Sequence, residues 1–164
     1  MNCREFVTDV YRAGPPQPRI AKKPEFYPGA STQQLSDAEL RLGATFPVSL
    51  RLLLLESNGV MDMMAIDGGD WFNDKWLLWP VAEIVDQNLW YRSEGTDTYE
   101  RDFCKLVFFA DAGSDGILFG FPVTPDSVCE QSIVVWHPIE DELADIAPSL
   151  EEFLKRWLTS TIWV

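Results

Sequence analysis

The chain has 164 residues, of which 46% are hydrophobic, and its formal net charge is −13. This length and composition suit one domain with a full core. The acidic balance would repel phosphate backbones, so it argues against a nucleic-acid partner and favours a basic protein partner. The acid excess is concentrated beyond residue 30, because the first 30 residues hold more bases than acids.

Three cysteines, Cys3, Cys104 and Cys129, are far apart and form no CxxC pair. The sequence therefore predicts neither a disulfide framework nor a zinc site, and free thiols fit a reducing compartment. Glu5 and Asp9 interrupt the apolar run that a signal peptide would need. No stretch approaches the ~18 apolar residues of a membrane span. We therefore expect a cytoplasmic protein without membrane contact.

Residues 1–35 are expected to lie outside the main domain, as a short helix followed by a proline-rich coil. Phe6, Val10 and Tyr11 share one helical face, which could dock on the body. Five prolines between residues 14 and 29 forbid regular helix and favour extended segments. The alternative is that this segment is an arm that binds a partner.

A helix is predicted over residues 36–42. Ser36 and Glu39 have the spacing of a capping box, in which each side chain satisfies an amide at the helix start. Leu35 and Leu40 are spaced to close a hydrophobic staple over that cap. The main domain is therefore taken to begin at residue 36 and to run to residue 164.

A second helix is predicted over residues 47–57. Gly43 can end the preceding helix in a left-handed conformation, and Pro47 suits a first helical turn. The new helix is apolar nearly all round, so we expect it to be buried. Asn58-Gly59 should end it, because both residues tolerate positive φ.

The next segment predicts a turn, a strand and a helix. Gly68-Gly69 marks a turn in an acidic stretch. Residues 75–79 can form a strand, and Pro80 then starts a helix over residues 81–91, whose apolar residues recur at helical spacing. The polar residues 93–102 are expected to form a loop.

A β-hairpin is predicted next, because the apolar runs 106–110 and 117–121 flank a turn that contains Asp111 and Asp115. Residues 132–137 form the last clear strand, and the acids Glu140, Asp141, Glu142 and Asp145 follow it.

The last predicted element is a helix over residues 149–159. Ser149 and Glu152 have the spacing of a second capping box. One face of this helix is an apolar stripe typical of an amphipathic helix. The stripe consists of Leu150, Phe153, Leu154, Trp157 and Leu158. Together the elements predict an α+β fold, an antiparallel sheet of about four to six strands with helices packed around it.

The order of these elements resembles the SUKH superfamily. The resemblance is carried by the capped helix, glycine, proline and apolar helix of residues 36–59, then by Trp79 to Ile84, the acidic hairpin and the closing helix. It covers residues 36–158. That superfamily includes the yeast regulator of cell-wall glucan synthesis and many bacterial immunity proteins that neutralise toxins. The resemblance implies an immunity protein that blocks a toxin by binding, or alternatively a regulatory scaffold with no toxin partner.

The sequence offers no motif for catalysis. His137 is the single histidine, and neither a G-x-S-x-G elbow nor a phosphate-binding glycine loop is present. A calcium loop beginning at Asp111 fails, because Gly113 and Pro122 stand where ligands are required. We therefore expect no enzymatic activity, no cofactor and no metal site, and the oligomeric state is left open.

The candidate partner-binding residues are acids in turns, together with one tryptophan. An acidic protein can fill the basic cleft that a nuclease toxin needs for phosphate. An aromatic anchor rimmed by acids would suit such a partner. The alternative is that the tryptophan folds back over a strand end. The candidates are Asp67, Asp70, Trp71, Asp111, Asp115 and Glu140.

Overall fold

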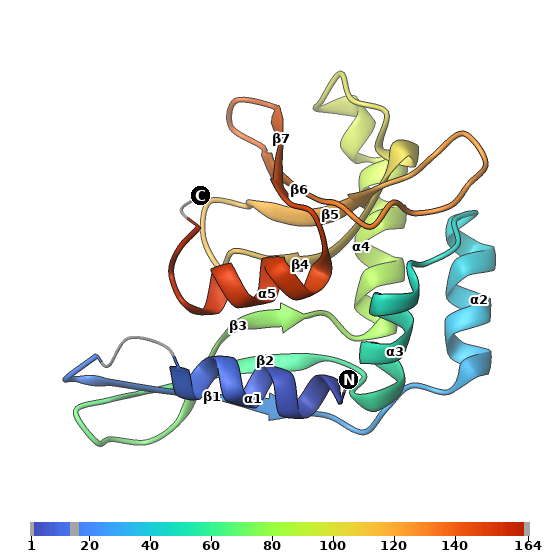
Figure 1. Cartoon of the computed structure of the whole chain (residues 1–164). Coiled ribbons are helices and arrows are strands. Elements are labelled where there is room, and N and C mark those ends of the chain that lie inside the picture. Colours follow the sequence, from blue (N-terminus) through green and yellow to red (C-terminus); the bar gives the residue numbers. More distant parts are fainter. Residues whose placement is uncertain (1, 14–16, 163–164) are drawn as a thin grey trace.

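The computed structural model describes residues 2–13 and 17–162. Pro15 and Pro16 of the proline-rich stretch lie outside the described residues, as does the side chain of Cys3. Over the described ranges, helices surround two antiparallel sheets, which confirms the α+β class (Figure 1). The strands are divided between a three-stranded and a four-stranded sheet instead of forming a single sheet.

The elements alternate along the chain, and each sheet is built from consecutive strands. The order of the first sheet is β1-β2-β3 and that of the second is β4-β5-β6-β7. The helices are α1 (Cys3–Ala13), α2 (Thr32–Leu42), α3 (Val48–Glu56), α4 (Val81–Ser93) and α5 (Leu150–Leu158), with short 3-10 turns at Gly95–Asp97 and Phe103–Lys105. The strands are β1 (Ile20–Phe26), β2 (Val60–Ile66), β3 (Phe72–Leu78), β4 (Leu106–Asp111), β5 (Leu118–Pro122), β6 (Ile133–His137) and β7 (Glu142–Ala147).

The start of α2 corrects the sequence interpretation. Ser31 is its N-cap, and Ser31 and Gln34 form a complete capping box. The predicted staple is wrong, because Leu35 is fully buried inside the helix whereas Leu40 is 82% exposed. The helix begins at Ser31 and not at Ser36, because the longer helix buries Leu35 in the core. Gly43 ends α2 with φ 57°, as predicted.

Helix α3 is only partly buried, contrary to expectation. Leu50, Leu53 and Leu54 belong to the core, but Val48 and Leu52 are 66% and 51% exposed. A helix at the rim of a domain can bury one face only, whatever its composition. The exposed pair Val48 and Leu52, four residues apart, therefore lies on the outer side of α3.

The prediction of coil before residue 30 is also wrong, because residues 20–26 form β1 and pair with β2 from Ile20↔Ile66 to Phe26↔Val60. Pro24 is tolerated because β1 is an edge strand, where a missing amide hydrogen breaks no ladder. After β6 the acids divide: Glu140 and Asp141 lie in a turn, whereas Glu142 and Asp145 belong to β7, which pairs with β6. Neighbouring strands, rather than local alternation, decide both structures.

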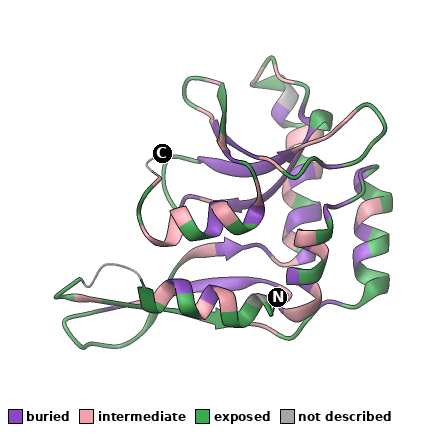
Figure 2. Ribbon diagram, viewed as in Figure 1, coloured by how far each residue is buried: buried purple, intermediate pink, exposed green. Residues whose placement is uncertain are grey.

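The aromatic part of the core packs on the two faces of the second sheet, with α4 on one face and α5 on the other. Phe108 faces Tyr91 of α4, and the next residue, Phe109, faces Phe153 of α5, as successive residues of a strand must. Trp136 is fully buried and lies within 6 Å of several rings on the α4 side. Figure 2 shows the inner strands buried and the hairpin turns exposed.

Two cysteines differ in accessibility, which gives a direct check of the packing. Cys104 is exposed, whereas Cys129 is buried, and burial raises the pKa of the Cys129 thiol to about 12. Because the thiolate is the reactive form, we expect iodoacetamide at pH 8 to modify Cys104 and to spare Cys129 until the protein is unfolded. Peptide mass spectrometry of the native and urea-treated protein would measure this difference. Equal labelling of both native thiols would contradict the fold.

Candidate functional site

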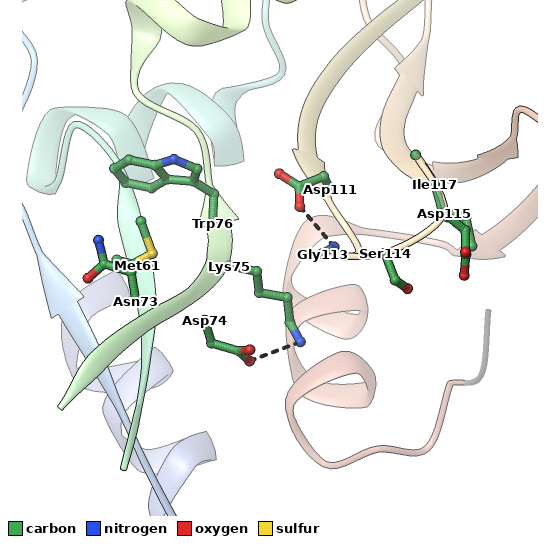
Figure 3. Close-up of a pocket in the computed structure, with 11 residues that line it drawn as sticks. Met61, Asn73, Asp74, Lys75, Trp76, Asp111, Gly113, Ser114, Asp115 and Ile117 are labelled. Atoms are coloured by element: carbon green, nitrogen blue, oxygen red, sulfur yellow. Dashed lines mark hydrogen bonds and ion pairs between the residues drawn. The ribbon is translucent and has the colours of Figure 1, made fainter. Parts of the chain in front are cut away.

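A groove of about 570 Å³ lies where β3 passes the turn between β4 and β5 (Figure 3). Acids, a lysine and a tryptophan line it together with the glycine-rich turn. Its lining consists of Met61, residues 73–76, Asp111 and residues 113–117. The groove therefore lies between the two sheets, and the hairpin turn predicted from the sequence forms part of its wall.

Asp111 is held in place by two hydrogen bonds. Its Oδ2 accepts from the Trp79 indole Nε1 at 2.8 Å, and its Oδ1 accepts from the backbone N–H of Gly113 at 2.8 Å. The backbone N–H of Trp79 donates to the carbonyl of Phe109 at 2.8 Å, which links the end of β3 to β4. Asp111 thus fixes the wall of the groove and contributes a negative charge to it.

Gly113 brings the turn close to β3. It has φ +82°, and a Cβ there would lie 3.1 Å from the Cβ of Lys75. A side chain is disfavoured at this position both by the backbone conformation and by the contact with the Lys75 stem. Glycine therefore lets the β4–β5 turn lie directly against β3.

The one lysine of the lining, Lys75, is already engaged. Its Nζ lies 5.2 Å from the centre of the Trp157 ring and 3.5 Å from Asp74 Oδ2. The same Asp74 oxygen lies 3.2 Å from Lys22 Nζ. Asp115 is exposed at the turn, with φ 55°. The lining therefore carries more negative than positive charge, and its positive charge is held by internal contacts.

The β2–β3 turn carries three of the predicted residues, apart from the groove lining. The carboxylate of Asp67 accepts two hydrogen bonds from Arg19, at 2.8 and 2.6 Å, and this contact lowers the pKa of Asp67. Trp71 is 42% exposed, and Lys23 Nζ lies 4.3 Å from the centre of its ring. Asp70, which lies between Asp67 and Trp71 in the sequence, is exposed. Among the described residues Asp70 forms no ion pair, whereas the ring of Trp71 is partly covered by the Lys23 ammonium group.

Glu140 lies on a third turn, between β6 and β7, and is exposed. The next residue, Asp141, accepts hydrogen bonds from Arg101 Nε at 2.7 Å and from Trp136 Nε1 at 2.9 Å, and these contacts lower its pKa. The structure thus brings Asp111 and Asp115 together in one groove and places the other candidates on separate turns.

Sequence reasoning missed the charged residues around β3. The sequence shows Asp74 only as one of the acids around Trp71. The ion pairs of Lys22 with Asp62 and Asp74, at 3.1 and 3.2 Å, join residues 40 and 52 positions apart in the chain. No local motif signals such contacts. The signal that the sequence does offer for these ion pairs is Lys22-Lys23, two adjacent bases in a chain with a net charge of −13.

Within the described ranges, no group of three His, Cys, Asp or Glu side chains could hold a metal ion. His137 is partly buried at the end of β6, where its backbone lies opposite Glu142 of β7 in the strand register. No helix among the described residues is long and apolar enough to cross a bilayer.

Comparison with known proteins bears on the whole arrangement. No curated protein matches the chain. The model of the SMI1 / KNR4 family (SUKH-1) matches residues 29–156, from the glycine that precedes α2 into the last turns of α5. This match covers α2, α3 and α4, the groove and the second sheet. The chain therefore belongs to the SMI1 / KNR4 family (SUKH-1).

Proposed function

We propose that this protein is a non-catalytic immunity protein that neutralises a basic, nuclease-type toxin by covering the toxin's active surface. Family membership supports a protein-interaction or immunity module at the level of the family. The observation that carries the finer proposal is the acid-lined groove between β3 and the β4–β5 turn, whose lysine is engaged by Asp74 and Trp157.

The physical argument is charge complementarity. A nuclease binds phosphate through a basic cleft, and an acidic surface that enters this cleft gains steering and specificity. Asp111 and Asp115 would make the central contacts, because both line the groove. Asp67, Asp70 and Trp71 on one turn, and Glu140 on another, would contact the partner outside the groove.

The alternative is a regulatory scaffold without a toxin partner, which the SMI1 / KNR4 regulators of the family favour. The two functions differ in their partner. Co-purification with the product of the neighbouring gene, followed by a toxicity assay of that product, would distinguish an immunity protein from a scaffold. A neighbour that is not toxic, or that does not bind, would support the scaffold.

Reversing the charge of Asp115 or Asp70 should slow association with the toxin. We expect Asp115→Lys to lower the association rate about tenfold at low salt and less at high salt, because steering is screened. Asp37→Lys on α2 makes the same charge change away from the groove lining, so it should have a smaller effect. Stopped-flow measurements across a salt series would test this. Binding that does not depend on salt would contradict the electrostatic part of the proposal.

A further inference from the structure

Strand β7 forms the outer edge of the second sheet. It pairs with β6 on one side, from His137↔Glu142 to Ile133↔Ala147, and it is the last strand in the sheet order. Figure 1 shows it on the side of the molecule opposite β1. Successive residues of an antiparallel strand direct their backbone N–H and C=O groups alternately to the two sides. About half of the backbone groups of β7 therefore point away from β6.

The outward backbone groups of β7 are open. Within residues 2–13 and 17–162, no residue of β7 forms a backbone–backbone hydrogen bond except to β6. The first four residues of the strand are exposed, as Figure 2 shows. An edge strand with unpaired N–H and C=O groups is a template for pairing with another extended chain. The ligand that this edge is built to take is therefore a peptide backbone.

The other sheet edges are protected or already in contact. Strand β1 carries Pro24, which lacks an N–H, next to Lys22 and Lys23, and proline and lysine are residues that block pairing at an edge. Strands β3 and β4 approach each other where Trp79 N donates to Phe109 O. Strand β7 contains neither proline nor lysine. It is therefore the edge that remains available for pairing.

The side chains of β7 indicate the composition of the strand that fits it. Residues 142–145 pair with β6 without a register shift, so they form a regular edge. Glu142 and Asp145 are exposed, and Leu143 beside Glu142 is 38% exposed. Opposite charges across a strand pair are favourable, whereas like charges are not. A strand with a basic residue opposite each acid and an apolar residue opposite Leu143 therefore complements this edge.

A second copy of this chain fits the edge less well. Two β7 strands paired antiparallel about Leu143 and Ala144 would place Glu142 of each copy opposite Asp145 of the other. This pairing opposes like charges twice, between chains that each carry a net charge of −13. The charge of the edge therefore favours a basic segment of a different protein over self-association.

We propose that β7 is a docking edge, to which a partner protein adds a basic, extended segment as a fifth strand of the second sheet. The backbone ladder supplies affinity, and the side chains of Glu142 and Asp145 select a basic segment, as in other cases of β-strand addition. No residue of β7 lines the acidic groove. This surface is therefore distinct from the groove and does not depend on the proposed toxin.

A short peptide tests the docking. The probe is fluorescein-Thr-Lys-Val-Val-Lys-Thr-amide, whose lysines have the spacing of Glu142 and Asp145 and whose sequence reads the same in both directions. Fluorescence anisotropy at low salt should show saturable binding to the full chain. The same peptide with both valines N-methylated keeps its charges but loses two backbone donors, so it should bind at least tenfold more weakly. No saturable binding at millimolar peptide, or equal binding of the two peptides, would overturn the docking edge.

Charge reversal and hydrogen exchange locate the site. Glu142→Lys combined with Asp145→Lys should weaken binding of the probe at least tenfold. Asp37→Lys combined with Asp126→Lys makes the same charge change at exposed positions outside β7, so it should weaken binding less than threefold. The bound probe should slow exchange of the outward β7 amides at least tenfold and leave the β1 amides unchanged. Equal weakening by the two double variants, or slower exchange at β1 instead of β7, would overturn the assignment and leave the toxin proposal untouched.

Discussion

Gly29→Ala is expected to destabilise the protein by about 3 kcal/mol. A Cβ at residue 29 would lie 1.9 Å from the carbonyl oxygen of Leu55 and 2.8 Å from its carbonyl carbon. These atoms belong to the backbone near the end of α3, so no side-chain rotation can relieve the contact. The neighbouring bond from Ala30 N to Leu54 O, at 2.8 Å, holds the two segments at this separation. Urea unfolding followed by tryptophan fluorescence would measure the loss.

The control for this change is Gly43→Ala, at the left-handed end of α2. A Cβ at Gly43 meets no atom within 4 Å, but φ there is +57°. We expect a loss of about 1 kcal/mol, from backbone strain alone. Equal losses for the two variants would show that the chain can move apart at Gly29, and would contradict the close approach seen in the structure.

Asn88→Ala is expected to cost about 3 kcal/mol, because it breaks a buried link between α4 and β4. The Asn88 side chain is 1% exposed. Its Nδ2 donates to the carbonyls of Ile84 and Phe108, at 2.7 and 2.8 Å, and its Oδ1 accepts from Phe108 N at 2.8 Å. Alanine would leave both backbone groups of Phe108 without these partners. Thermal unfolding would measure the effect as a lowered Tm.

Asn73→Ala is the matched control, since Asn73 is exposed on β3. Its removal should change the free energy of unfolding by about 0.5 kcal/mol or less, as is usual for a surface position. A small loss in Asn88→Ala would mean that water replaces the amide, and the link would then not be needed to hold α4 on the sheet.

The parts of the fold that could be predicted from the sequence are those in which nearby residues decide the structure. Ser149 caps α5 by accepting from Glu152 N at 3.2 Å, and Phe153 and Leu154 of the predicted stripe are buried. Gly43 ends α2 as expected. In each case the cap, the stripe and the stop lie within one or two turns of each other, so tertiary contacts only confirm a local preference.

The parts that could not be predicted depend on distant partners. Lys22 and Pro24 give no alternating pattern, and β1 forms because β2 offers a free edge. Ser31 and Ser36 both offer a cap to α2, and burial of Leu35 decides between them. Strand β2 is buried along most of its length, so it too lacks the alternation that marks a half-exposed strand.

The candidate site shows the same division. The sequence marked Asp111 and Asp115 as turn residues, and the structure places both in the groove. It could not show that Arg19, 48 residues away, neutralises part of the β2–β3 turn through Asp67, nor that Lys23 covers Trp71. Composition reveals the charge of a surface, but only the fold shows which charges remain free to meet a partner.

The order of strands within the two sheets has a consequence for the kinetics of folding. Every strand pairs only with its neighbour along the chain, and only the β1–β2 pair encloses other elements, namely α2 and α3. Closing short loops costs little entropy, and chains rich in such pairings cross the folding barrier quickly. The second sheet can form as successive hairpins, so the slow step is expected to be the late return of β1 to β2.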